Sequence, residues 1–155
     1  MFLRSFYNDE IRCRIVGIPV NKTGQSKNMK AHFKNAWGYQ GDAMNLPVEN
    51  AAEAAKFYES VMGFRVEDRI DEPVRKIVFA RDDVKIVLVE NGGDATQDGV
   101  AFEVDSVEAA LEEFKANGLK KELSDIDQET NDSGTWRVFY IIAPDGLCYW
   151  IGEKQ

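Results

Sequence analysis

The chain has 155 residues, 44% hydrophobic and 11% aromatic, enough for one globular domain with its own core. No apolar run approaches the roughly 18 residues of a membrane-spanning helix, and the first twenty residues lack the apolar stretch of a secretory signal. Two cysteines, Cys13 and Cys148, predict neither a disulfide framework nor a zinc cage, so a reducing cytoplasm is expected. The net charge of −8 argues against a nucleic-acid partner.

Charge is distributed unevenly along the chain. Residues 1–41 hold seven basic and two acidic side chains, a net +5, whereas residues 42–155 carry a net −13. This asymmetry predicts a basic N-terminal arm, residues 1–41, that packs on an acidic body. An arm that binds a separate partner is the alternative.

Within the arm, a short alternation over residues 10–20 predicts a strand that ends near Pro19. Ser26 then predicts the start of a short helix that ends at Gly38, with lysines on one face and apolar side chains on the other. The apolar face comprises Met29, Phe33, Ala36 and Trp37. We expect this helix to pack on its own domain, although such a face could also bind a membrane or a partner.

From residue 42 the hydrophobic pattern becomes regular. The first half predicts a strand over 43–48, a helix from Glu49-Asn50 to Gly63, and strands over 64–71, 74–80 and 84–90. The same order then repeats, with a strand over 99–104, a helix from Asp105-Ser106 to Asn117-Gly118, and strands over 119–126, 136–143 and 147–152.

The two halves align with each other. Residues 46–50 match residues 102–106 at an offset of 56, and Gly63 matches Gly118 at 55. Similarity at this spacing predicts two copies of a β-α-β-β-β unit, modules 42–91 and 98–153. We expect an α+β fold in which the two modules form an open, curled eight-stranded barrel with an N-terminal strand and helix arm. Its concave, mostly apolar face is where a small molecule would bind.

This duplicated pattern resembles the vicinal oxygen chelate superfamily, which includes glyoxalase I, bleomycin resistance proteins and extradiol dioxygenases. The resemblance covers about residues 42–153 and is more specific for the fold than for a reaction. It is carried by Leu46-Pro47-Val48, Lys56-Phe57-Tyr58-Glu59, Met62-Gly63-Phe64, Phe102-Glu103-Val104-Asp105-Ser106, Gly118 and Ala143-Pro144-Asp145-Gly146. Since members usually pair their modules within or between chains, the resemblance also implies a homodimer.

Metal-dependent members hold a divalent ion in the cleft with His, Gln or Glu side chains. The resemblance places these ligand positions at Ala43, Val87, Gly99 and Trp150, none of which offers a side-chain donor to a divalent ion. We therefore expect a divergent member with no metal and no other cofactor. A register slip of one residue would instead offer Asp42 and Asp98, the arrangement that could still hold a divalent metal ion.

Other chemistry-bearing residues give no catalytic motif. The single histidine, His32, lies between Lys30 and Lys34, which disfavour its protonation, and is expected to be a surface or packing residue. Cys13 and Cys148 are expected to be inert packing side chains. A nucleophile elbow, a phosphate-binding loop and a dinucleotide fingerprint are all missing from the sequence. No catalytic residue is identified, and we expect a protein that is not an enzyme.

Strand parity predicts which side chains line the concave face. They are Asn45, Val87, Val89, Ala101, Arg137, Cys148 and Trp150. The alternation over 136–143 leaves open which of its two faces points inward, and Arg137 depends on that choice. Small side chains leave volume and Trp150 offers a flat wall, so we expect a flat or aromatic ligand held by stacking and by Asn45 or a strand arginine. The alternative is that these side chains simply fill the barrel.

The leading hypothesis is metal-independent binding of a small molecule, as the resemblance to bleomycin resistance proteins implies. One alternative is a glyoxalase-type lyase or isomerase, or a dioxygenase, that uses a divalent metal with unusual ligands. A second is a protein-interaction module that uses Phe33 and Trp37 of the arm. The expected partners are a small-molecule ligand and a second copy of the chain, with neither nucleic acid nor membrane.

Overall fold

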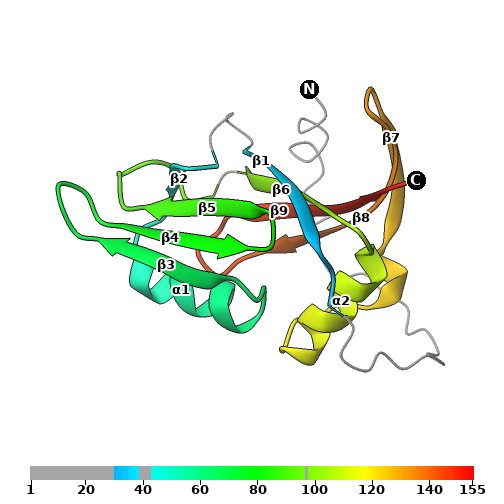
Figure 1. Ribbon diagram of the computed structural model, residues 1–155, viewed down its shortest axis with the longest axis horizontal. Coiled ribbons are helices and arrows are strands. Elements are labelled where there is room, and N and C mark those ends of the chain that lie inside the picture. Colours follow the sequence, from blue (N-terminus) through cyan, green and yellow to red (C-terminus); the bar gives the residue numbers. More distant parts are fainter. Residues whose placement is uncertain (1–29, 39–42, 97) are drawn as a thin grey trace.

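The computed structural model describes residues 30–38, 43–96 and 98–155, which form two sheets with helices packed against them (Figure 1). The strands are β1 (Phe33–Gly38), β2 (Leu46–Pro47), β3 (Arg65–Ile70), β4 (Lys76–Arg81), β5 (Val84–Val89), β6 (Asp98–Val104), β7 (Asp127–Asn131), β8 (Gly134–Ile142) and β9 (Cys148–Lys154). The helices are α1 (Ala51–Ser60), α2 (Val107–Ala116) and a short 3-10 helix, η3 (Leu123–Asp125). No helix in this described part of the chain is long and apolar enough to cross a membrane.

Each sheet is built around one β-α-β-β-β module. The four-stranded sheet has the order β2-β5-β4-β3, and the five-stranded sheet has the order β1-β6-β9-β8-β7. In both modules the first strand pairs parallel with the last, β2 with β5 and β6 with β9, and the remaining pairs are antiparallel. The predicted α+β fold of two curled, unclosed modules is therefore confirmed.

The two helices begin in the same way, which reflects the internal repeat. The side chain of Asn50 accepts a hydrogen bond from the third backbone N–H of α1, and Ser106, 56 residues later, does the same for α2. In each module a glutamate at the end of the last strand, Glu90 or Glu153, also accepts the first N–H of the helix, at 2.9 Å in both cases. These acceptors satisfy donors that a helix start leaves without partners.

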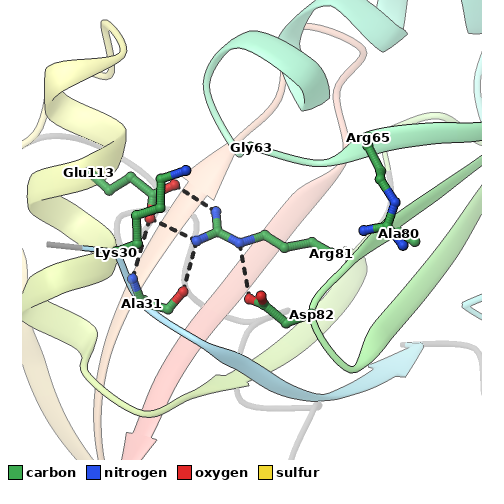
Figure 2. A pocket seen from close by; sticks show the side chains of 8 residues that line it. All are labelled: Lys30, Ala31, Gly63, Arg65, Ala80, Arg81, Asp82 and Glu113. Carbon is green, nitrogen blue, oxygen red and sulfur yellow. Dashed lines mark hydrogen bonds and ion pairs between the residues drawn. The ribbon is translucent and has the colours of Figure 1, made fainter. Parts of the chain in front are cut away.

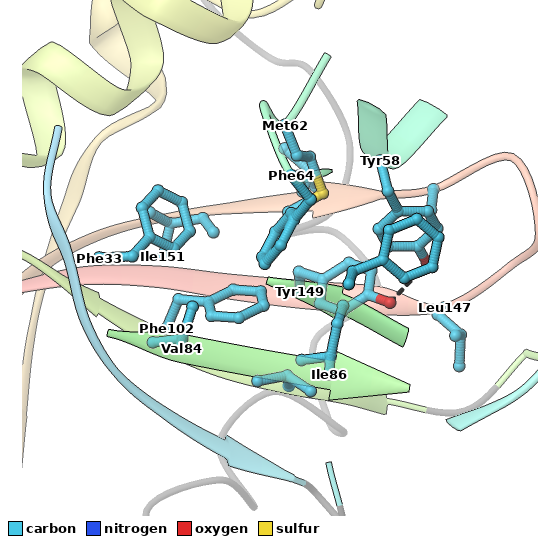
Figure 3. Close-up of a cluster of buried hydrophobic side chains, with 14 of the residues drawn as sticks. Phe33, Tyr58, Met62, Phe64, Val84, Ile86, Phe102, Leu147, Tyr149 and Ile151 are labelled. Atoms are coloured by element: carbon cyan, nitrogen blue, oxygen red, sulfur yellow. Dashed lines mark hydrogen bonds between the residues drawn. The ribbon is translucent and has the colours of Figure 1, made fainter. Parts of the chain in front are cut away.

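One continuous core joins both helices to both sheets (Figure 3). Phe33 of β1 is fully buried in this core, with ring centroids 5.8 Å from Phe64 and 5.3 Å from Phe102. Phe64 comes from the first module and Phe102 from the second, so β1 helps to hold the modules together. Edge-on aromatic pairs of this kind add about 0.5–1.5 kcal/mol each beyond the area that they bury.

A buried hydroxyl network also links the modules. Tyr58 of α1 donates to the carboxylate of Asp145, in the turn between β8 and β9, at 2.7 Å, and its hydroxyl is hydrogen-bonded to that of Tyr149 on β9. Burial raises the pKa of both tyrosines well above the usual value and also raises the pKa of Asp145. Both hydroxyls therefore stay protonated at neutral pH.

The helix predicted to end at Gly38 is wrong in its described part. Phe33–Gly38 is the strand β1, which pairs antiparallel with β6 and extends that sheet. A bulge between Phe33 and Asn35 adds one residue, so that Phe33 and Ala36, three residues apart, both contact the core. A bulged strand thus produces the three-residue spacing that predicts a helix. The strand predicted over 10–20 lies outside the described residues.

Two further strand predictions are corrected. The strand predicted over 119–126 is an irregular segment that contains η3, and the true edge strand β7 follows it as a wholly polar run. The strand predicted over 43–48 is limited to the two residues of β2, with a turn at its start. Pro47 lacks the N–H that a longer ladder would need.

Candidate functional site

The five-stranded sheet has two different faces. Phe139 and Ile141 of β8 point into the core beneath α2, whereas alternate side chains of β6, β8 and β9 form a second cluster on the opposite side. This second cluster, which we call the aromatic face, comprises Ala101, Trp136, Val138, Tyr140, Cys148 and Trp150, with Trp37 of β1 packed against it. Neither α1 nor α2 contributes a residue to it.

All three tryptophans of the chain meet on this face. The rings of Trp136 and Trp150 lie edge to face with centroids 5.2 Å apart, and Trp37 meets Trp136 in the same way at 6.4 Å. The ammonium of Lys154 lies 5.8 Å from the centre of the Trp136 ring, within the range of a cation–π contact. The face therefore combines flat apolar surface with the capacity to attract a positive charge.

Trp150 lies along the sheet and does not project across it. A Cβ added to Gly152, two residues further along β9, would come within 2.4 and 2.5 Å of carbons of the Trp150 ring. Contact this close means that the indole rests on the bare backbone of Gly152. The ring therefore packs against β9 as a fully buried part of the aromatic face.

A carboxylate from β7 lies among these rings. Glu129 pairs across the ladder with Trp136, and its oxygens accept hydrogen bonds from the hydroxyl of Tyr140 at 2.5 Å and the indole N–H of Trp150 at 3.3 Å. Glu129 was not among the predicted site residues. The turn residues Asn131–Gly134 were the available signal, because they indicate a hairpin partner immediately before β8.

The structure brings three predicted lining residues together, because Ala101, Cys148 and Trp150 all belong to the aromatic face. It does not bring Arg137 there. The guanidinium of Arg137 donates to Glu108 of α2 at 2.6 Å, on the helix side of the sheet. On β8, the side chains that belong to the aromatic face are therefore Trp136, Val138 and Tyr140. The prediction that Arg137 lines the site is wrong.

The remaining predicted lining residues belong to the first module. Val87 and Val89 are buried on β5, whose alternate residues Ile86 and Leu88 belong to the core. Their side chains therefore point away from α1, as the predicted parity requires. Asn45 is exposed and precedes β2.

The positions that would carry metal ligands do not fit a divalent ion. Val87 and Trp150 have no suitable donor, and Ala43 contributes its carbonyl oxygen to the backbone N–H of Val87 at 3.1 Å. A bulge in β6 turns Gly99 toward the ring of Tyr149 in the core, so Gly99 does not share a face with Ala101. Residues 30–38, 43–96 and 98–155 contain no group of three or more His, Cys, Asp or Glu that could hold a metal ion. The alternative ligand Asp42 lies outside these ranges.

Cys148 differs from its predicted role as an inert thiol. It occupies the first position of β9 and is disulfide-bonded, and no cysteine within the described residues is free. The other cysteine of the chain, Cys13, lies outside the described residues. A disulfide therefore forms on the aromatic face itself.

His32 lies at the entry to β1 and is half-exposed, as predicted for a surface residue. Its Nε2 is hydrogen-bonded to the carboxylate of Asp83 at 2.7 Å, and this bond, with the charge of nearby Asp82, raises the pKa of the imidazole. The two carboxylates therefore outweigh Lys30 and Lys34, which were expected to disfavour protonation of His32. The contact anchors β1 to the turn between β4 and β5.

A cavity of about 200 Å³ lies where β1, β4 and α2 meet (Figure 2). The guanidinium of Arg81 crosses it and bonds the carboxylate of Glu113 at 2.7 and 2.8 Å. Its other donors reach the carbonyl oxygens of Met62 and Ala31 and the carboxylate of Asp82. With all five N–H groups of the arginine in use, this cavity is a structural junction between the modules and a weaker candidate for a binding site.

Comparison with known proteins places this geometry in a wider group. A family model described as the Glyoxalase/Bleomycin resistance protein/Dioxygenase superfamily matches residues 41–147. An integron cassette protein from V. cholerae is 21% identical, with a TM-score of 0.57 over 74% of this chain and 94% of that one. A bleomycin-binding protein complexed with bleomycin is 19% identical, with a TM-score of 0.55 over 73% and 97%. A lactoylglutathione lyase from Agrobacterium tumefaciens is 17% identical, with a TM-score of 0.53 over 71% and 90%. No curated protein matches the chain.

Proposed function

The chain belongs to the Glyoxalase/Bleomycin resistance protein/Dioxygenase superfamily, and from this premise we propose that it binds a flat, aromatic small molecule on the aromatic face without a metal ion. Proteins of this fold include one solved with bleomycin bound and one described as a lyase. Binding and catalysis are therefore both compatible with the fold, and the choice between them depends on the side chains of the site.

The observation that carries the proposal is the position of Glu129 among the tryptophans. Indole rings offer flat surfaces on which a planar ligand stacks, and such contacts are worth about 0.5–1.5 kcal/mol each beyond buried area. The carboxylate of Glu129, between Tyr140 and Trp150, places a negative charge at the edge of that surface. The ligand class that suits both features is a planar ring system that bears a hydrogen-bond donor or a positive charge.

The side chains at the expected metal-ligand positions favour ligand binding over metal-dependent catalysis. Val87 and Trp150, at two of the positions where the metal-dependent members carry ligands, are an alkyl side chain and an indole. An indole N–H only donates hydrogen bonds, and here it is directed at Glu129. We derive no reaction for this site and propose sequestration of an unchanged ligand.

Tryptophan fluorescence tests the proposal, because every tryptophan of the chain lies on the aromatic face. Proflavine, a planar cation, and acridine, its neutral counterpart at mildly alkaline pH, are titrated into the full-length protein with and without a thiol reductant. We expect saturable quenching, stronger for proflavine, that is weakened at least about tenfold by Glu129→Gln, which removes the charge. Glu59→Gln, on the exposed side of α1, is the matched control and should bind like wild type.

Two results would contradict the proposal. Quenching that does not saturate with either compound under either redox condition would remove the aromatic face as a ligand site. Tight one-to-one uptake of Ni, Zn, Fe or Mn by protein purified without chelator would overturn metal independence.

Trp150→Phe retains a ring but loses the N–H, so it should change the affinity for proflavine less than Glu129→Gln does.

A further inference from the structure

The cavity in Figure 2 carries more positive than negative charge. It is lined by three basic and two acidic side chains, those of Lys30, Arg65, Arg81, Asp82 and Glu113. Its local balance of +1 contrasts with the net −8 of the whole chain. We propose that this cavity is a ligand site separate from the aromatic face, and that it binds a phosphate group between Lys30 and Arg65.

The acidic side chains of the cavity already have partners on the protein. Glu113 is bound by Arg81 at 2.7 and 2.8 Å and accepts the backbone N–H of Ala31 at 3.4 Å. Asp82 accepts the backbone N–H of Phe33 at 2.9 Å and the Nε–H of Arg81 at 3.4 Å. In the described part of the chain, neither carboxylate pairs with the other two basic side chains of the cavity.

The basic side chains differ in how much of their charge is used. All five N–H groups of Arg81 have acceptors, so this residue adds positive charge to the cavity but no donor. Arg65 has one ion pair, with Glu67 at 3.4 Å, and Lys85 holds the same glutamate more closely, at 2.9 Å. Lys30 is exposed and forms no ion pair with the described residues. Two positive charges at the cavity are therefore available to a ligand.

The elements that carry these two charges meet at Arg81. Lys30 directly precedes Ala31, whose carbonyl oxygen accepts a hydrogen bond from Arg81 at 2.8 Å, and Arg65 is the first residue of β3. In Figure 2, Lys30 and Arg65 lie on either side of Arg81. A Cβ on Gly63 would come within 2.7 Å of the Arg81 guanidinium, so bare backbone forms this wall of the cavity. The two available charges thus flank a hollow beside a third cation.

Size and charge select the class of ligand. The cavity of about 200 Å³ is smaller than the roughly 300–1,000 Å³ of a site for a drug-sized molecule. A phosphate group carries a charge of about −1.5 to −2 at neutral pH and has three strong acceptor oxygens, which suits two cationic donors better than a singly charged carboxylate does. Arginine binds such a group through two parallel N–H bonds, and lysine binds it as a point charge. Inorganic phosphate and a short phosphomonoester share this chemistry.

A bound phosphate would also strengthen the junction between the modules. Lys30 belongs to the segment before β1, which pairs with the second module, whereas Arg65 belongs to the first module. The folded chain brings the two side chains to one cavity, so the ligand stabilises the folded state. For a dissociation constant of about 1 mM, as two charge-assisted contacts allow, about 20 mM phosphate should raise the melting temperature by about 4–7 °C.

An NMR titration of the full-length protein with inorganic phosphate, at an ionic strength held constant with chloride, tests the site. We expect the amide signals of Gly63 and Arg65 to shift saturably. Lys30→Gln and Arg65→Gln should each weaken the binding of phosphate about tenfold. Lys56→Gln is the matched control and should bind like wild type, because Lys56 is an exposed lysine of α1 that pairs with Glu53.

Melting temperature separates binding from the general effect of the salt. Phosphate also stabilises proteins because it is excluded from their surface, and that effect survives the loss of Lys30 and Arg65. We expect phosphate to raise the melting temperature more in wild type and in Lys56→Gln than in the double variant Lys30→Gln/Arg65→Gln. An equal rise in all three proteins, or no saturable shift of the Gly63 and Arg65 amides up to about 50 mM phosphate, would overturn the proposal.

Two further ligands identify the source of the phosphate group. Tighter binding of glycerol 1-phosphate than of inorganic phosphate would show that the site takes a phosphomonoester, and the reverse order would show that it takes the free ion; both results sustain the proposal. Acetate that binds as tightly as phosphate would overturn it, because one negative charge would then be enough. None of the cavity residues belongs to the aromatic face, so these results do not depend on the proposed function.

Discussion

Replacing Glu113 by Gln should lower the free energy of unfolding by about 3–5 kcal/mol, because it removes the bidentate counter-charge of the buried Arg81 guanidinium and leaves it only the longer contact with Asp82 at 3.4 Å. The two side chains are 7% and 9% exposed and make a bidentate pair at 2.7 and 2.8 Å. A glutamine keeps one acceptor and turns an NH₂ group toward the arginine, so one of the two hydrogen bonds is lost as well.

The position of Arg81 explains why this loss is not local. The same guanidinium donates to the carbonyl oxygens of Met62, after α1, at 2.6 Å and of Ala31, before β1, at 2.8 Å. It also lies 4.3 Å from the centre of the Phe33 ring in the core. Disturbing it therefore loosens both modules and the entry to β1. For a domain of this size the expected cost corresponds to a drop in melting temperature of about 6–20 °C.

Urea unfolding followed by circular dichroism measures the effect. The matched control is Glu108→Gln on the same helix, because Glu108 is 55% exposed and pairs with the 34% exposed Arg137. That substitution should cost about 1 kcal/mol or less. A Glu113→Gln variant within about 1 kcal/mol of wild type would refute the reasoning. The double variant Arg81→Met/Glu113→Leu should cost less than the sum of the two single substitutions, because neither charge is then left buried without the other.

Three further changes test other contacts. The pKa of His32, measured by NMR, should lie above 6.5, and Asp83→Asn should lower it; the stabilisation from this contact is complete below pH about 6.5 and is lost as pH rises through the raised pKa. Tyr58→Phe removes the donor to a buried carboxylate, and should cost about 1–3 kcal/mol in urea unfolding. Gly152→Ala should displace the Trp150 ring, at a cost of about 1–3 kcal/mol and with a shift in tryptophan emission; unchanged emission would contradict that packing.

The duplicated modules could be predicted because their signals are local. Asn50 and Ser106 are N-caps at an offset of 56, and each is followed by an apolar helical face and a glycine. Capping and hydrophobic spacing depend on residues within one or two turns of a helix. Such signals are readable from the chain without knowledge of what lies on the other side of the sheet.

The misassigned elements are those whose signal depends on a partner strand. Phe33 and Ala36 have helical spacing because a bulge, defined by the pairing of β1 with β6, places both in the core. β7 has no apolar residue that would mark it as a strand and is stabilised as an edge by β8. Since β7 was assigned to the wrong residues, Glu129 was missed with it.

The contacts of the site depend on the same long-range geometry. The alternation of β8 does not reveal which of its two faces points toward the site. The position of α2 decides this, because Glu108 of α2 binds Arg137 on the opposite side of the sheet. A disulfide at Cys148 depends on which segment comes within bonding distance of β9, which spacing along the chain does not reveal.

The distribution of aromatic side chains distinguishes the aromatic face from the core beneath the helices. The core beneath the helices contains six phenylalanines, Phe33, Phe64, Phe79, Phe102, Phe114 and Phe139, whereas every tryptophan lies on the aromatic face. Phenylalanine packs without polar demands, but a buried indole N–H needs an acceptor. Trp136 uses Ser133 and Trp150 uses Glu129. Glu129, half-buried on the edge strand β7, therefore satisfies the donors of Tyr140 and Trp150, and its charge is what the proposed ligand site would use to select a planar molecule with a donor.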